Sequence, residues 1–242
     1  MMNYFNSIKQ NDALKEALYE IPASIFFVIF YSFLIGPIIG PEGTAIKLLI
    51  GAALFALVYF IETNVFFPKV DVHIIPIISY IESLRRNDIS IFLYRLPGQF
   101  AGAVLAILMI WTTIAPESKS LYSFEYFQLD PFLTALFTGF IAQFAYLLHF
   151  FVMVRMKIAS SVLRFFIFSA GLGVLFFIVT QFGKITLLNP FGFLAISILN
   201  GHQGHIQTIF LGVVIHIVVP MVFISGTHFF LNRVDRIIGI ND

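Results

Sequence analysis

The sequence contains no cysteine, a single tryptophan and few charged residues, which make up only 11% of its 242 positions. The absence of cysteine excludes disulfides, thiolate metal ligands and thiol nucleophiles. A soluble domain has about 25% charged residues, so the low fraction argues against a soluble enzyme. The net charge of +1 provides neither a basic excess for nucleic acid nor an acidic tail. We therefore expect no nucleic-acid partner.

Apolar residues take the place of the missing charges. Hydrophobic residues make up 59% of the chain, 31 residues are phenylalanine, and the mean hydropathy is +0.94. Several apolar runs approach the roughly 20 residues that a helix needs to cross a bilayer. The sequence therefore predicts an all-α integral membrane protein that has the lipid bilayer as its partner.

Six apolar segments are predicted to span the membrane. They cover residues 21–41, 48–68, 89–112, 131–152, 165–182 and 207–231. Two further apolar pieces, residues 73–84 and 189–200, are too short to cross a bilayer, and each has a proline near its start. The chain thus shows three spans with a short proline-containing segment between the second and third, followed by the same order again.

This repetition predicts a single transmembrane domain made of two repeats, at about residues 14–112 and 130–232. Because each repeat holds an odd number of spans, the second must lie inverted relative to the first. Paired short segments at matching positions of such repeats point to a site near the membrane midplane. We therefore expect the functional site between the two halves.

Positive charges give an independent prediction of topology, because Lys and Arg favour cytoplasmic loops. With six spans and both termini cytoplasmic, only Lys47, Lys119 and Lys184 of the 14 Lys and Arg residues lie outside. An odd number of spans would scatter these residues over both sides. We therefore expect both termini in the cytoplasm and a location in the cell (inner) membrane.

Four local motifs, spread over both halves, carry a family resemblance. They are Glu20-Ile-Pro-Ala-Ser, His73-Ile74-Ile75-Pro76, Gln99-Phe-Ala-Gly-Ala and Asn189-Pro190. Two re-entrant half-helices within six spans, together with these motifs in this order, resemble the aquaporin (major intrinsic protein) family over nearly the whole chain. The resemblance implies an aquaporin-like fold, passive passage of water or small neutral solutes, and a homotetramer.

Two positions depart from the family pattern. Ile75 stands where asparagine is expected, and Gly192 stands where the family has arginine. The N-terminus of a half-helix directs free N–H groups and the positive end of its dipole into the lumen, which opposes cations. Asn189 can cap its half-helix and offer an amide to the lumen, whereas Ile75 can do neither. The lumen beside Ile75 is therefore expected to be more hydrophobic.

The resemblance also places four residues at the outer constriction of the lumen. They are Phe55, Phe177, Thr186 and Gly192. The constriction would be apolar, because two of these side chains are aromatic and none carries a positive charge. Such a constriction could pass small uncharged solutes, gate by dewetting or be shut.

Two carboxylates lie in or beside the predicted spans. Glu62 follows Phe55 by two helical turns, about 10 Å, so it faces the lumen if Phe55 does. A carboxylate inside a membrane is costly to keep and therefore suggests a function. The alternatives for Glu62 are a hydrogen bond to backbone donors of the first short loop, or a shifted span boundary. Glu20 is expected to support that loop.

The histidines do not predict a metal site. His202 and His205 are three residues apart, but their glycine neighbours favour a loop and no carboxylate or thiol completes a ligand shell. His216 lies deep in the sixth span and is expected to be a buried, hydrogen-bonded residue. The sequence contains no serine-nucleophile motif of the hydrolase type, no phosphate-binding glycine loop and no zinc motif. We therefore expect no metal, no cofactor, no catalytic residue and no enzymatic activity.

The preferred interpretation is a passive channel for water or small neutral solutes. The alternative is a non-conducting scaffold or subunit of a membrane complex, with an unidentified membrane partner and an occluded lumen. The missing asparagine, the missing arginine and the absence of an acidic residue at Thr138-Gly139 favour that alternative. A third interpretation is a proton- or ion-coupled transporter that uses Glu62.

Overall fold

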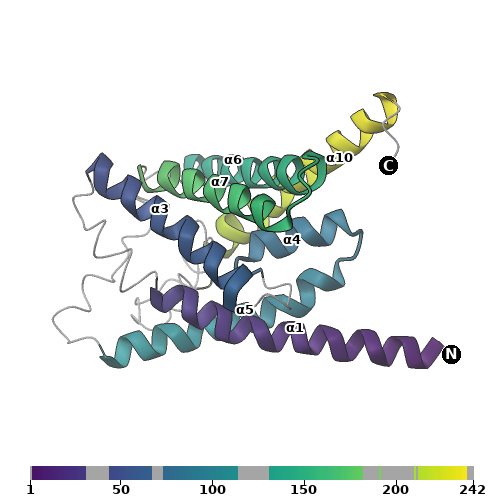
Figure 1. Cartoon of the computed structure of the whole chain (residues 1–242), viewed down its shortest axis with the longest axis horizontal. Coiled ribbons are helices and arrows are strands. Elements are labelled where there is room, and N and C mark those ends of the chain that lie inside the picture. The colour runs from purple at the N-terminus through teal and green to yellow at the C-terminus, as the bar shows by residue number, and fades with distance from the viewer. Residues whose placement is uncertain are drawn as a thin grey trace.

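The computed structural model describes residues 2–30, 44–66, 73–113, 131–181, 191, 210 and 212–238, which contain helices and no strands. The α-helices are α1 (Met2–Phe30), α3 (Ala45–Ile61), α4 (Pro76–Arg85), α5 (Ser90–Thr113), α6 (Pro131–His149), α7 (Ser161–Gln181) and α10 (Val219–Ile238), as Figure 1 shows. Short π-helical turns continue α3 and α6 and precede α10: η2 (Glu62–Phe66), η4 (Phe150–Arg155) and η6 (Val214–Val218).

Four helical stretches in the described residues are long and apolar enough to cross a membrane. They are Ala45–Phe66, Ser90–Ile110, Phe132–Arg155 and Val214–Val234. The prediction of an all-α membrane protein is therefore confirmed, while the count of six spans stays a prediction. The apolar part of α7, Ser161–Leu175, is shorter, and the expected first span extends past the described end of α1. Helix α1 begins at Met2, well before the uncharged run that starts at residue 21.

The bounds of α4 follow from local chemistry. Pro76 occupies the first turn, where its missing N–H is not needed by the helix. At the other end Asn87 adopts a left-handed conformation with φ of 51°. The amide N–H of Asn87 donates to the Leu84 carbonyl at 3.1 Å and that of Asp88 donates to the Ser83 carbonyl at 2.8 Å. This pair of bonds is a Schellman motif, so α4 stops after about three turns.

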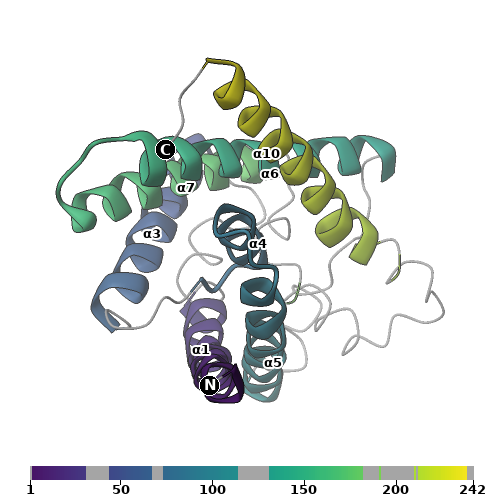
Figure 2. The same cartoon turned by 90° about the vertical axis from the view of Figure 1, so that its right-hand side faces the viewer.

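The longer helices pack in three pairs around α4. Helix α1 packs along α5, α3 along α7, and α6 along α10. Figure 2 shows α4 in the middle, between the α1–α5 pair and the helices α6, α7 and α10. Two pairs approach closely at glycine: a Cβ atom on Gly102 would lie 2.5 Å from the Ile21 carbonyl oxygen, and one on Gly173 would lie 2.7 Å from that of Ala52. Small residues permit such close crossings of membrane helices.

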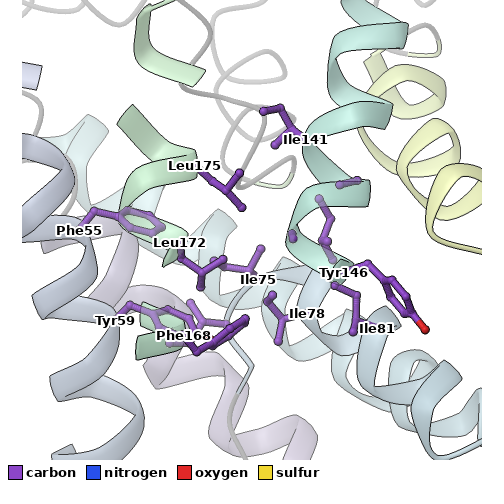
Figure 3. Close-up of a cluster of buried hydrophobic side chains, with 14 of the residues drawn as sticks. Phe55, Tyr59, Ile75, Ile78, Ile81, Ile141, Tyr146, Phe168, Leu172 and Leu175 are labelled. Carbon is purple, nitrogen blue, oxygen red and sulfur yellow. The ribbon is translucent and has the colours of Figure 1, made fainter. Parts of the chain in front are cut away.

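A central apolar cluster joins helices from both halves of the chain. Phe55, Ile75, Ile78, Phe168 and Leu172 all belong to it, and each is at least 95% buried. Figure 3 shows these side chains pointing toward one another from α3, α4 and α7. Large apolar side chains are also exposed on the outside of the helices. An apolar exterior is expected where lipid, rather than water, surrounds the protein.

Candidate functional site

The chain enters α4 through a tight turn. The amide N–H of Ile75 donates to the His73 carbonyl at 2.5 Å, which closes a three-residue turn centred on Ile74. Ile74 has a φ of 61°, a left-handed conformation that strains a β-branched residue by about 1–3 kcal/mol. Ile75 precedes the helix in an extended conformation and makes no side-chain capping bond. Backbone donors near the start of α4 therefore need another acceptor.

Glu20 on α1 supplies that acceptor. Its carboxylate accepts the amide N–H of His73 at 2.8 Å and that of Ile74 at 2.9 Å. It also accepts the side-chain amide of Gln99 on α5 at 3.3 Å. The Glu20 carboxylate is completely buried. These contacts are those of the loop-supporting carboxylate that the sequence suggests for Glu20, and they hold the strained turn against α1.

Polar side chains from three helices surround this turn. Gln99 donates to the Ser79 hydroxyl at 2.8 Å, and that hydroxyl lies 3.2 Å from Nδ1 of His73. Arg95 on α5 contacts the imidazole of His73 and donates to a Glu16 carboxylate oxygen at 2.9 Å. The network gives partners to the Ser79 hydroxyl, the His73 ring and the Arg95 guanidinium, which would otherwise be costly to bury in a membrane.

Arg95 is a structural residue that sequence reasoning missed. Its side chain is 1% exposed, and its Nε lies 3.9 Å from a carboxylate oxygen of Glu20. The sequence placed it only as a cytoplasmic cation near the start of the third span. One signal was present: Arg95 is the only cation within the apolar segment 89–112. An ionisable residue in such a segment generally pairs inside the protein.

Glu62 lies in a different environment. It begins η2 directly after α3 and is fully buried, with 0% of the residue exposed. Neither of its carboxylate oxygens has a hydrogen-bond partner among the described residues. Glu62 therefore does not bond to the described part of the first loop, 73–75, as one alternative proposed. A π-helical turn of this kind often occurs at functional positions.

The residues expected at the outer constriction are placed only in part. Phe55 is 1% exposed and packs edge-on against Phe27, with the ring centroids 5.5 Å apart. Phe177 is partly buried and packs against the same central apolar cluster. Four other residues that the sequence predicts for the constriction or the second half-helix lie outside the described residues: Thr186, Asn189, Pro190 and Gly192.

A cavity of about 220 Å³ adjoins the central apolar cluster. We call it the basic vestibule, because its charged lining consists of Glu82, Arg85, Arg86 and Arg164. Part of its wall is apolar: Tyr59, Ile78 and Phe168 line the cavity and also belong to the central apolar cluster. His73, which contacts Arg95 in the polar network before α4, also lines the cavity.

Glu82 is the acidic member of the vestibule. It accepts a hydrogen bond from Nε of Arg85 at 2.7 Å and another from Nε of Arg86. Burial acts to raise the pKa of this carboxyl, but the hydrogen bonds and charges of the two arginines outweigh burial and lower the pKa to about 2 from its usual 4.5. The carboxylate is therefore ionised at neutral pH.

The histidines give no sign of a metal centre in the described ranges. His216 is buried in η6 and, with Pro76, lines a second cavity of only about 10 Å³. His202 and His205 fall outside the described residues. Among the residues that are described, no group of three His, Cys, Asp or Glu side chains could hold a metal ion.

Comparisons with known proteins do not extend this description. No protein-family model matches the chain, and no curated protein matches it. The function therefore has to be inferred from the arrangement of α4, the central apolar cluster and the basic vestibule.

Proposed function

We propose that the chain forms an aquaporin-like channel that passes water or small neutral solutes passively through the membrane. The observation that carries this proposal is the position of α4. This helix is too short to span a bilayer, begins at Pro76 in the protein interior and is surrounded by longer helices. Glu20 holds the turn before it. A short helix that starts inside a membrane protein is typical of discontinuous segments at solute sites.

The pairing of helices supports the inverted repeat of residues 14–112 and 130–232. A two-fold exchange of the halves would relate α1 to α6, α3 to α7 and α5 to α10. It would convert the α1–α5 pair into the α6–α10 pair and leave the α3–α7 pair unchanged. These three pairs have the most extensive contacts among the described helices. In this proposal Asn189-Pro190 begins the second half-helix, both termini are cytoplasmic, and the protein resides in the cell membrane.

The central apolar cluster favours neutral solutes over ions as the molecules that pass through the channel. A neutral solute that crosses an apolar constriction gives up a few hydrogen bonds, each worth about 1–3 kcal/mol. An ion must give up far more hydration energy, which the dipole of one half-helix cannot replace. We therefore expect no ion conductance, even though Gly192 stands where the family has arginine.

The second candidate function is a non-conducting scaffold or complex subunit with an occluded lumen. One observation favours it: Phe55, Ile75 and Leu172 are each about 99% buried, so their side chains leave little space at the centre. In the channel interpretation the same packing is a narrow apolar gate that limits the flow of neutral solutes. The two functions differ in whether solute ever passes this gate.

Swelling of vesicles that contain the purified protein distinguishes these functions. We expect water, glycerol, urea or ammonia to enter such vesicles several-fold faster than protein-free vesicles, while ion flux stays at background. Asn189→Ile should slow the swelling, because it removes an amide donor from the lumen. Swelling at the protein-free rate for every solute, with correctly folded protein, would support the scaffold instead.

A further inference from the structure

The basic vestibule carries more positive charge than a passive channel for neutral solutes requires. The guanidinium groups of Arg85, Arg86 and Arg164 line it together with one carboxylate, that of Glu82. Tyr59 and Phe168 form part of the same wall and lower its polarity. Charges of one sign in a concave space with apolar walls focus the electric field, so the cavity attracts anions.

The single carboxylate does not offset this excess. Glu82 is shared by Arg85 and Arg86, which lie three and four residues after it on the same helical face. Nε2 of His149 lies 3.5 Å from Oε2 of Glu82. Three guanidinium groups and one carboxylate therefore line the cavity. Arg85 and Arg86 are held by Glu82, so the donor group that bears on ligand binding is that of Arg164.

Arg164 reaches the cavity from α7, in the second half of the chain. Its Nη1 makes only a long hydrogen bond, 3.5 Å, to the Met153 carbonyl oxygen. Its Nε is buried and has no hydrogen-bond partner within the described ranges. A guanidinium is a planar fork of five N–H donors, which binds two oxygens of one anion at once. One edge of this fork is therefore available to a ligand.

The start of α7 also lies at the cavity wall. Ser161 is the first residue of α7 and lines the cavity. Ser160 accepts the amide N–H of Leu163 at 3.2 Å and so serves as part of the cap. The positive end of the helix dipole lies at this terminus and favours a nearby anion.

We propose that the basic vestibule is a binding site for a phosphate group. Arginine forks match the tetrahedral oxygens of phosphate, and the cavity of about 220 Å³ is several times the roughly 30 Å³ that one water occupies. The phosphate is either free in solution or the phosphomonoester headgroup of a lipid. This proposal depends only on the residues of the basic vestibule. A failure of the channel function would therefore not refute it, and absence of phosphate binding would not refute the channel.

Titration calorimetry of the lipid-free protein in detergent tests the site. One arm uses inorganic phosphate, and the other uses dioctanoyl phosphatidic acid with dioctanoyl phosphatidylcholine as the lipid control. Arg164→Gln should weaken binding at least about tenfold, because it removes a charged hydrogen-bond fork. Arg164→Lys keeps the charge but not the fork and should weaken binding less. The matched control is Arg155→Gln, since Arg155 stacks on Phe150 and does not line the vestibule.

The calorimetry either identifies the source of the phosphate group or refutes the proposal of a phosphate site. Saturable binding of inorganic phosphate that depends on Arg164 supports a free anion. Saturable binding of phosphatidic acid alone, with the same dependence, supports a lipid headgroup. Binding of neither compound by the wild-type protein would overturn the proposal. An equal loss in Arg155→Gln and Arg164→Gln would also overturn it, because general surface charge would then explain the binding.

Discussion

At the scale of single residues, Glu20 and Glu62, the two described carboxylates with no exposed surface, have different energetic roles. Glu20 accepts backbone hydrogen bonds from His73 and Ile74 and lies near Arg95. Glu62 is equally buried but makes no hydrogen bond within the described residues. A buried polar group with partners stabilises its surroundings, whereas one without partners costs free energy. The same substitution at the two positions should therefore change stability in opposite directions.

Leucine substitutions test this contrast. Glu20→Leu should lower the free energy of unfolding by about 2–5 kcal/mol, because two buried backbone donors lose their acceptor. Glu62→Leu should be neutral or stabilising, because it removes an unpaired buried carboxylate and keeps similar volume. The measurement is the thermal unfolding midpoint of each purified variant in one detergent. A strongly lowered midpoint for Glu62→Leu would show that its carboxylate has a stabilising partner.

Glu82 predicts a specific dependence of stability on pH. Its pKa in the folded protein is about 2, below the usual 4.5, so the unfolded chain takes up this proton first as pH falls. The stabilisation by the Glu82 carboxylate is therefore complete above about pH 4.5 and is lost as pH falls toward 2. Between pH 6 and pH 3, the unfolding midpoint of the wild type should fall more than that of Glu82→Gln. Equal decreases would contradict the ion pairs with Arg85 and Arg86.

At the scale of helices, close crossings depend on glycine at particular positions. A Cβ atom on Gly102 of α5 would lie 2.5 Å from the Ile21 carbonyl oxygen of α1. Gly226 on α10 has no atom within 4 Å of the corresponding position. The sequence indicates Gly102 through the family motif but does not reveal which helix it contacts.

Alanine substitutions at these glycines form a matched pair. Gly102→Ala should lower the free energy of unfolding by about 1–3 kcal/mol, because α1 and α5 must separate to admit the methyl group. Gly226→Ala should be neutral or stabilising by up to about 1 kcal/mol, because alanine favours helix and meets nothing. Thermal unfolding in detergent measures both. Equal effects of the two variants would mean that the α1–α5 crossing is not tight.

The helices were more predictable than the contacts between them. The start of α4 at Pro76 follows from proline at a first turn, and its end follows from the polar run Arg85-Arg86-Asn87-Asp88. The hydrogen bond from the His73 amide to Glu20 crosses 53 residues of sequence, so local patterns contain no signal for it beyond the family resemblance. Likewise, the approach of Arg164 to Glu82 in one cavity depends on how α7 packs.

At the scale of the whole molecule, the family resemblance implies a homotetramer with one lumen in each subunit. The exposed apolar side chains, such as Phe132 and Phe229, fit contact with lipid or with other subunits. Native mass spectrometry from a mild detergent should give a mass four times that of the 27.4 kDa chain. Only monomer under several mild conditions would contradict this expectation, while leaving a channel within each chain intact.

We propose that two aromatic side chains expected at the outer constriction, Phe55 in the central apolar cluster and Phe177 packed against it, limit the flow of neutral solutes. Phe55 is almost fully buried, and Phe177 packs against the same cluster. Replacing both rings by alanine should open space in this cluster, whereas Phe144→Ala, at a side chain that is 58% exposed, should not. Because the barrier is apolar, the opened protein should still exclude ions.

The most direct measurement is stopped-flow swelling of vesicles that contain equal amounts of folded wild type, Phe55→Ala/Phe177→Ala or Phe144→Ala. We predict that the double variant swells at least several-fold faster than wild type and that Phe144→Ala swells at the wild-type rate. A double variant that folds yet stays as impermeable as protein-free vesicles would contradict the channel and favour the scaffold.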